Sequence, residues 1–132
     1  MNFDTVKVLV IDDDPIMISY VVNLLQRIGV GQVIQAKDGS TGLAIAASDK
    51  PDVILSDIHM TPMDGLEFVR NLRKHPVTDL RRTPVLIMSA DSSTDKLNEA
   101  LPLGIAGYIV KPPAISALQV KLEQALKFRY VR

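Results

Sequence analysis

Short apolar runs alternate with longer amphipathic stretches along the whole chain. The apolar runs are continuous and rich in β-branched residues, a pattern typical of strands buried on both faces of a parallel sheet. Strands are expected at residues 8–11, 33–36, 53–55, 85–88 and 108–110. The stretches between them repeat apolar residues at helical spacing. They predict helices near residues 15–28, 40–49, 65–74 and 93–101, and a last helix from residue 114.

Several local signals mark where the predicted helices begin and end. Asp14 followed by Pro15 is typical of an N-cap and a first helical residue. Gly29 fits the C-cap of the same helix. Pro102 is expected to shorten the fourth helix, because proline is poorly tolerated in a helix interior. Residues 75–84 are expected to form a polar connection.

Five strands alternating with five helices predict an α/β fold, namely a doubly wound, five-stranded parallel sheet with right-handed crossovers. The chain has 132 residues, which suits one domain. We expect this domain to occupy residues 1–132, with a core over about 6–128 and no output domain. No internal repeat or linker interrupts the pattern.

Composition and charge exclude several classes of function. Cysteine is absent, which excludes disulfides and thiolate metal sites. Fifteen basic and fifteen acidic side chains give zero net charge, which argues against nucleic-acid binding as the main role. The basic residues clustered over 70–82 are interpreted as a solvated helix end. No apolar run approaches the length of a membrane span, and no signal peptide precedes the first strand. A cytoplasmic domain without a membrane segment is therefore expected.

Polar side chains that could bind a ligand or take part in a reaction follow four of the five predicted strands. They are Asp12, Asp13, Asp57, Ser89 and Lys111. Any one of them alone is more simply a turn or cap residue. Ligands of open α/β sheets, however, bind at the carboxyl ends of the strands, where these residues should meet. Clustered carboxylates need protons, a lysine or a cation as compensation, and Mg²⁺ prefers such oxygen ligands. A cation, an ammonium and a hydroxyl together suit phosphoryl transfer, for which a carboxylate can be the nucleophile.

With these residues in view, the chain resembles the receiver domains of two-component response regulators, and specifically the single-domain chemotaxis type. The resemblance extends from residue 6 to about residue 126. It rests on the segments VLVIDDDP at 8–15, DVILSDIHMTPMDG at 52–65, VLIMSA at 85–90 and GYIVKP at 107–112. It implies a flavodoxin-like (βα)5 fold with strand order 2-1-3-4-5.

The resemblance also implies a magnesium site and a phosphoacceptor. Asp57 matches the aspartate that takes the phosphoryl group. Asp12 and Asp13 match the acidic pair that binds Mg²⁺ together with Asp57. The backbone carbonyl of His59 is expected to complete the protein ligands of the ion.

Further residues match positions that respond to the phosphoryl group. Ser89 and Lys111 match the hydroxyl and the lysine that contact it, and Tyr108 matches the aromatic side chain whose rotamer changes with the hydroxyl residue. The peptide bond between Lys111 and the proline after it is expected to be cis. His59 and Asp91 match positions that tune the lifetime of the acyl phosphate, unless both are merely exposed loop residues.

The implied function is that of a phosphoacceptor in a two-component phosphorelay. A histidine kinase or a histidine phosphotransfer protein would supply the phosphoryl group. The domain would then switch a face built from its fourth helix, fifth strand and last helix, which binds a downstream protein. Homodimerisation through that face stays open. Beyond Mg²⁺-dependent self-phosphorylation and autodephosphorylation, no enzymatic activity is expected.

Two departures and two alternatives accompany this interpretation. Thr61 separates Met60 from Pro62, where receivers usually carry Met-Pro, and Pro113 stands where phenylalanine is common. One alternative is a binding-only receiver that does not cycle phosphate. The other is a phosphatase of the haloacid-dehalogenase type, with Asp12 as its nucleophile.

Overall fold

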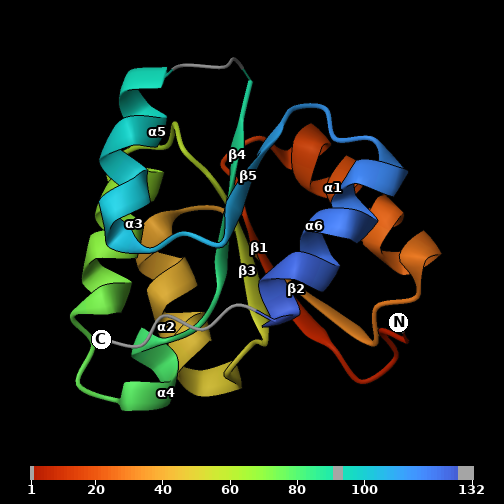
Figure 1. Ribbon diagram of the computed structural model, residues 1–132, viewed down its shortest axis with the longest axis horizontal. Helices are drawn as coiled ribbons and strands as arrows, with labels where there is room; N and C mark the ends of the chain where they lie inside the picture. Colours follow the sequence, from red (N-terminus) through yellow and green to blue (C-terminus); the bar gives the residue numbers. More distant parts are fainter. Residues whose placement is uncertain (1, 91–93, 128–132) are drawn as a thin grey trace.

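The structure, a computed structural model, describes residues 2–90 and 94–127. Its centre is one sheet of parallel strands in the order β2-β1-β3-β4-β5 (Figure 1). The strands are β1 (Lys7–Ile11), β2 (Gln32–Ala36), β3 (Val53–Asp57), β4 (Val85–Ser89) and β5 (Gly107–Val110). Both the doubly wound α/β class and the predicted strand order are confirmed.

Helices cover both faces of the sheet (Figure 1). α1 (Pro15–Ile28) and α6 (Ile115–Lys127) pack on one face, while α2 (Gly39–Asp49), α3 (Gly65–Arg73) and α5 (Thr94–Ala100) lie on the other. Successive side chains of a strand point to opposite faces. In β1, Val8 and Val10 therefore join the core beneath α1 and α6, whereas Leu9 and Ile11 join the opposite core. Burial on both faces explains the continuous apolar runs of the three central strands β1, β3 and β4, whereas the edge strands β2 and β5 are partly exposed.

The predicted ends of α1 are confirmed. The side chain of Asp14 accepts a hydrogen bond from the N–H of Ile16 at 3.0 Å, and Pro15 opens the helix. Gly29 ends it in the left-handed region, with φ of 99°. The Asp14 cap fixes where α1 begins, immediately beside the acidic residues that follow β1, and the Gly29 cap fixes where the chain leaves α1 toward β2.

One prediction for the second half of the chain needs correction. Residues 75–84 are not only a polar connection, because they contain a short helix, α4 (Thr78–Arg81), whose Leu80 is buried. Apart from its prolines this segment has two apolar residues, Val77 and Leu80, which are too few to establish a helical period, so the pattern did not reveal this helix. The expected shortening of the helix before Pro102 is confirmed, because α5 ends at Ala100 and continues as a 3₁₀ turn, η1 (Leu101–Leu103), which accommodates the proline.

Arg73 is the clearest exception to the predicted solvated helix end. Its side chain is buried, with only 9% of the residue exposed. The guanidinium donates hydrogen bonds of 2.9–3.0 Å to the carbonyl oxygens of Arg81, Thr83, Leu103 and Gly104. It therefore ties the end of α3 to the segments that precede β4 and β5.

Among the helices of residues 2–90 and 94–127, none has the length and apolar character that crossing a membrane requires.

Candidate functional site

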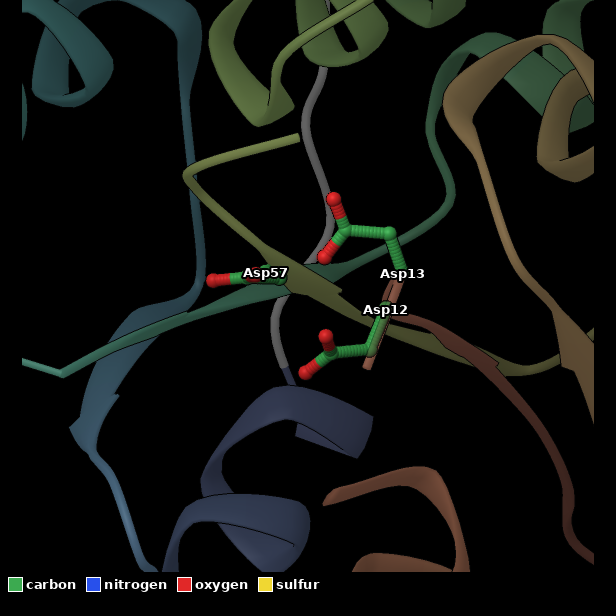
Figure 2. Close-up of side chains that lie close together, drawn as sticks. All are labelled: Asp12, Asp13 and Asp57. Atoms are coloured by element: carbon green, nitrogen blue, oxygen red, sulfur yellow. The ribbon is translucent and has the colours of Figure 1, made fainter. Parts of the chain in front are cut away.

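Three aspartates converge where β1 and β3 end. Asp12 and Asp13 follow β1, and Asp57 is the last residue of the neighbouring strand β3. One carboxylate oxygen from each residue lies within 4.8 Å of the others (Figure 2). Asp12 is fully buried and Asp57 is nearly so, whereas Asp13 is exposed. The parallel register thus brings together carboxylates that are 45 positions apart in the sequence.

Lys111 reaches the same cluster from the end of β5. Its Nζ atom lies 2.7 Å from Oδ2 of Asp12 and 3.1 Å from Oδ1 of Asp57. The backbone N–H of Lys111 donates to the carbonyl oxygen of Ser89 at 2.7 Å, which joins the ends of β4 and β5. The peptide bond between Lys111 and Pro112 is cis, as predicted. One ammonium therefore bridges two buried carboxylates.

Burial and neighbouring charges shift the pKa values of both Asp57 and Lys111. Burial raises the pKa of the Asp57 carboxyl, the negative charge of Asp12 raises it further, and Lys111 offsets only part of this effect. Burial alone would lower the pKa of Lys111, but its hydrogen bond to Asp12 and the charge of Asp57 outweigh burial and raise it. Lys111 therefore stays protonated, and its single positive charge does not balance the negative charges of the carboxylates.

The donor set fits a hard divalent cation. With three carboxylates and one ammonium, the ionised site carries a net charge of −2 (−3 + 1). Oδ1 of Asp12 accepts a hydrogen bond from the N–H of Asp14 at 2.9 Å, and the buried Oδ2 has the ammonium of Lys111 as its neighbour at 2.7 Å. Carboxylate oxygens with uncompensated charge are the ligands that Mg²⁺ and similar ions prefer.

A shallow cavity gives access to this cluster from solvent. Its volume is about 280 Å³, and it is lined by Asp13, His59, Met60, Thr61 and Asp64. The exposed carboxylate of the cluster therefore faces solvent, while the two buried ones lie behind it. Of the three aspartates, Asp13 is the one that lines this cavity.

The loop after β3 is built close to Asp57. The N–H of His59 reaches Oδ1 of Asp57 at 3.4 Å. Gly65 begins α3 and donates its N–H to the carbonyl oxygen of Ile58 at 2.9 Å. A Cβ atom on Gly65 would overlap the carbonyl oxygen of Asp57 and lie 2.8 Å from Cα of Ile58. Only glycine permits this approach, so Gly65 sets the position of the loop beside the acids. The Thr61–Pro62 peptide bond in this loop is cis.

An ion pair links this loop to α5. Asp64 caps α3 by accepting a hydrogen bond from the N–H of Glu67 at 2.8 Å, and its second carboxylate oxygen lies 3.6 Å from Nζ of Lys96. Sequence reasoning did not identify this pair or the role of Gly65. The Asp-Gly dipeptide at 64–65 signals a helix start, but sequence spacing cannot show which residue lies against Asp57.

The remaining predicted residues that the structure describes differ in their burial. Ser89 is buried at the end of β4, one residue beyond the partner of Asp57 in the sheet register. The side chain of Tyr108 is directed outward from β5 and is 44% exposed. His59 is exposed at the rim of the cavity. Asp91 lies outside the described residues.

A larger cavity of about 530 Å³ lies at the opposite end of the strands. It is lined by residues that precede β3 and β4, including Pro51, Asp52, Thr83 and Pro84. Its size exceeds that of the cavity beside Asp13, but it does not touch the aspartate cluster. The chemistry of the donor set, rather than the size of the hollow, identifies the acidic edge as the candidate site.

The chain belongs to the response regulator receiver domain family, whose family model matches residues 8–123. The chemotaxis protein CheY-3 of Vibrio cholerae is 33% identical over 118 residues, which cover 89% of each chain. The chemotaxis protein CheY of Pseudomonas aeruginosa is also 33% identical, with 89% of this chain and 94% of the relative covered. These relatives place the chain among the chemotaxis-type receivers of two-component signalling.

Solved structures agree with this assignment. A structure of V. cholerae CheY4 crystallised at low pH has a TM-score of 0.84 and 34% identity, and covers 92% of this chain and 98% of its own. The receiver domain of the sensor histidine kinase PA1611 of P. aeruginosa has a TM-score of 0.83 at 24% identity, with 93% and 98% of the two chains covered. At 24% identity, the similarity to the PA1611 receiver domain is evidence for the fold alone. That structure is described as having a magnesium ion coordinated in its active-site cleft.

Proposed function

We propose that Asp57 is the phosphoacceptor of this receiver and takes its phosphoryl group from the phosphohistidine of a histidine kinase or a phosphotransfer protein. The observation that carries the proposal is the position of Lys111, whose ammonium lies 2.7 Å from Asp12 and 3.1 Å from Asp57. This arrangement places a fixed positive charge beside the carboxylate oxygen that would attack phosphorus. Preorganised charge of this kind is the main contribution that proteins make to phosphoryl transfer.

The residues that would hold Mg²⁺ are Asp12, Asp13 and Asp57, with the backbone carbonyl of His59 as a further ligand. The net negative charge that remains when the ammonium of Lys111 is set against three carboxylates supports this set. When bound, Mg²⁺ supplies positive charge that stabilises the phosphoryl oxygens. The magnesium ion in the PA1611 receiver domain is consistent with the same use of the acidic edge.

The transfer step needs only groups that the donor and this chain provide. A carboxylate oxygen of Asp57 forms a bond to phosphorus while the P–N bond of the donor phosphohistidine breaks, and the electron pair of that bond remains on the imidazole nitrogen. Lys111 balances the charge of the phosphoryl oxygens, and the hydroxyl of Ser89 donates a hydrogen bond to one of them. In autodephosphorylation, water attacks phosphorus and inorganic phosphate leaves. His59 and Asp91 are proposed to tune the rate of that step.

The proposed output is a change of the face formed by α5, β5 and α6. This is the face of the fourth helix, fifth strand and last helix in the sequence-based numbering, because α4 was not predicted. Tyr108, Val110 and Val120 are large hydrophobic side chains exposed on β5 and α6. Movement of Ser89 and Lys111 toward the phosphoryl group would favour an inward rotamer of Tyr108. A downstream protein would recognise the altered face, and a second copy of the chain is the other partner that a binding assay can detect.

Family membership removes the phosphatase alternative, in which Asp12 is the nucleophile. The binding-only receiver is tested directly. The chain is incubated with acetyl phosphate and Mg²⁺, and its intact mass is measured. We expect the wild-type chain and an Asp49→Asn control, altered on the exposed end of α2, to gain one phosphoryl group. Asp57→Asn should gain none. Failure of the wild-type chain to gain mass, combined with tight binding of beryllofluoride, would establish the binding-only receiver instead.

A further inference from the structure

A lysine of α6 contacts the tyrosine of the proposed switch. The Nζ atom of Lys121 lies 5.8 Å from the centroid of the Tyr108 ring. Ammonium groups within about 6 Å of an aromatic ring are attracted by the negative charge of its face. Because Tyr108 is 44% exposed, this contact forms at the surface of the protein.

The stem of Lys121 reaches the ring by passing the edge strand of the sheet. A Cβ atom on Gly107 would lie 3.7 Å from Cδ and 3.9 Å from Nζ of this lysine, so the side chain runs close to the strand at that residue. Side chains alternate across a strand, so Gly107 is directed toward α6 and Tyr108 toward the opposite face. Lys121 therefore extends from α6 around β5 to a ring on the far side.

The ring is the partner that the structure gives this ammonium. Within residues 2–90 and 94–127, Lys121 forms no ion pair with a carboxylate, and the hydroxyl of Tyr108 makes no hydrogen bond. Neither group is thus held in place by a stronger competing interaction. An inward rotation of the ring would leave the ammonium without this contact.

We propose that Lys121 is a latch that holds Tyr108 outward and so sets the resting balance of the switch. The inference rests on the proposed function, in which the inward rotamer accompanies phosphoryl binding. The lysine contacts the outward state and not the inward one, and a contact made in only one of two states biases the equilibrium toward that state. The latch therefore weakens the binding of any ligand that needs the inward state, because that state is populated less.

The test measures the affinity of the phosphoryl analogue beryllofluoride in the presence of saturating Mg²⁺. Lys121→Met keeps a long apolar stem beside Gly107 and removes the charge. We expect its dissociation constant to be about two- to fivefold lower than that of the wild-type chain, the change that loss of an exposed cation–π contact produces. Lys121→Arg keeps a cation for the ring and should bind beryllofluoride like the wild-type chain.

A second background separates the latch from a general effect of the lost charge. In a Tyr108→Leu chain there is no ring to hold, so adding Lys121→Met should leave the affinity unchanged. An unchanged dissociation constant for Lys121→Met in the wild-type background would overturn the proposal. The same decrease in both backgrounds would also overturn it, because the lysine would then act by long-range charge alone.

Fluorine NMR of 3-fluorotyrosine at position 108 tests the latch without any phosphoryl analogue. We expect Lys121→Met to move the resonance away from its wild-type position, because the outward state becomes less populated and the cation leaves the ring. We expect Lys121→Arg to leave it in place. Identical spectra for all three chains would overturn the latch. Failure of the wild-type chain to bind beryllofluoride would instead count against the proposed function, so the two failures are distinguishable.

Discussion

Replacing Lys111 by methionine isolates the charge that compensates the two buried carboxylates. The substitution keeps a long apolar side chain and removes the ammonium that lies 2.7 Å from Asp12 and 3.1 Å from Asp57. The two carboxylates, with oxygens within 4.8 Å of each other, would then repel one another. At an effective dielectric of 20, two unit charges at that distance repel by about 3.5 kcal/mol. The apo protein should therefore lose stability.

The size of this loss has a ceiling that depends on pH. The variant can relieve the repulsion by binding one proton. The ordinary pKa of an aspartate is 3.8, so holding that proton at pH 7 costs about 4.4 kcal/mol, at about 1.36 kcal/mol for each pH unit. At pH 5 the same cost falls to about 1.6 kcal/mol. We expect a loss of about 3–4 kcal/mol at pH 7, as when a buried ion pair is broken, and less than half of that at pH 5.

Urea unfolding followed by circular dichroism, with a chelator present to remove divalent cations, measures these free energies. The matched control is Lys127→Met at the exposed end of α6, which should change stability by no more than about 0.5 kcal/mol. The sign of the pH effect is fixed, because the variant raises the pKa of a folded-state carboxyl. Its destabilisation must therefore vanish below pH 3.8 and grow as the pH rises. A loss under about 1 kcal/mol at pH 7, or one equal at pH 5 and pH 7, would refute the reasoning.

Three further substitutions test other parts of the structure. Asp57→Asn should raise the urea midpoint at pH 7, because burial and Asp12 raise the pKa of the native carboxyl. This gain in stability should disappear as the pH falls to 3.8. A lower midpoint at pH 7 would contradict the charge assignment. Gly65→Ala should lower the free energy of unfolding by about 1–3 kcal/mol in the same assay, because its Cβ atom would displace the backbone of Asp57. It should also weaken Mg²⁺ binding measured by calorimetry. Wild-type values for both would show that the loop can move without cost. Arg73→Met should lower the free energy of unfolding by about 2–4 kcal/mol, because it leaves buried carbonyl groups without donors. The control Arg70→Met, at an exposed residue, should lower it by less than about 0.5 kcal/mol. Equal effects would mean that burial of Arg73 is unimportant.

Much of the fold could be predicted from the sequence because its signals are local and mutually consistent. Strands buried on both faces have continuous apolar sequences, which the runs at 8–11, 53–55 and 85–88 show clearly. The caps at Asp14 and Gly29 depend on side-chain and backbone chemistry within one helical turn, so they can be identified without tertiary information. Alternation of the two element types then leaves few possible topologies.

The features that were missed depend on contacts between distant segments. Leu80 is the one buried residue of α4, and nothing in its sequence neighbours indicates that the core beside α3 can accept it. Arg73 lies in a basic stretch that is typical of a solvated helix end, and only the approach of the segments before β4 and β5 provides carbonyl groups for its guanidinium. Both errors arise because tertiary packing overrides local polarity.

The candidate site shows the same division. Because carboxyl ends of parallel strands meet at one edge, the sequence could indicate that Asp12, Asp57 and Lys111 lie together. It could not distinguish the buried Asp12 from the exposed Asp13, because neighbouring residues at a strand end can face different environments. The contact between Lys121 and Tyr108 was also beyond prediction, since it requires the lysine to pass around an edge strand.

The most direct measurement of the central proposal locates the phosphoryl group on the chain. After incubation with acetyl phosphate and Mg²⁺, borohydride reduction converts a phosphorylated aspartate to homoserine, and peptide mass spectrometry then identifies its position. We predict homoserine at residue 57 alone, and only when Mg²⁺ is present. Homoserine in place of Asp12 or Asp13, or at no aspartate while the mass of the intact chain still rises, would contradict the proposal that Asp57 is the phosphoacceptor.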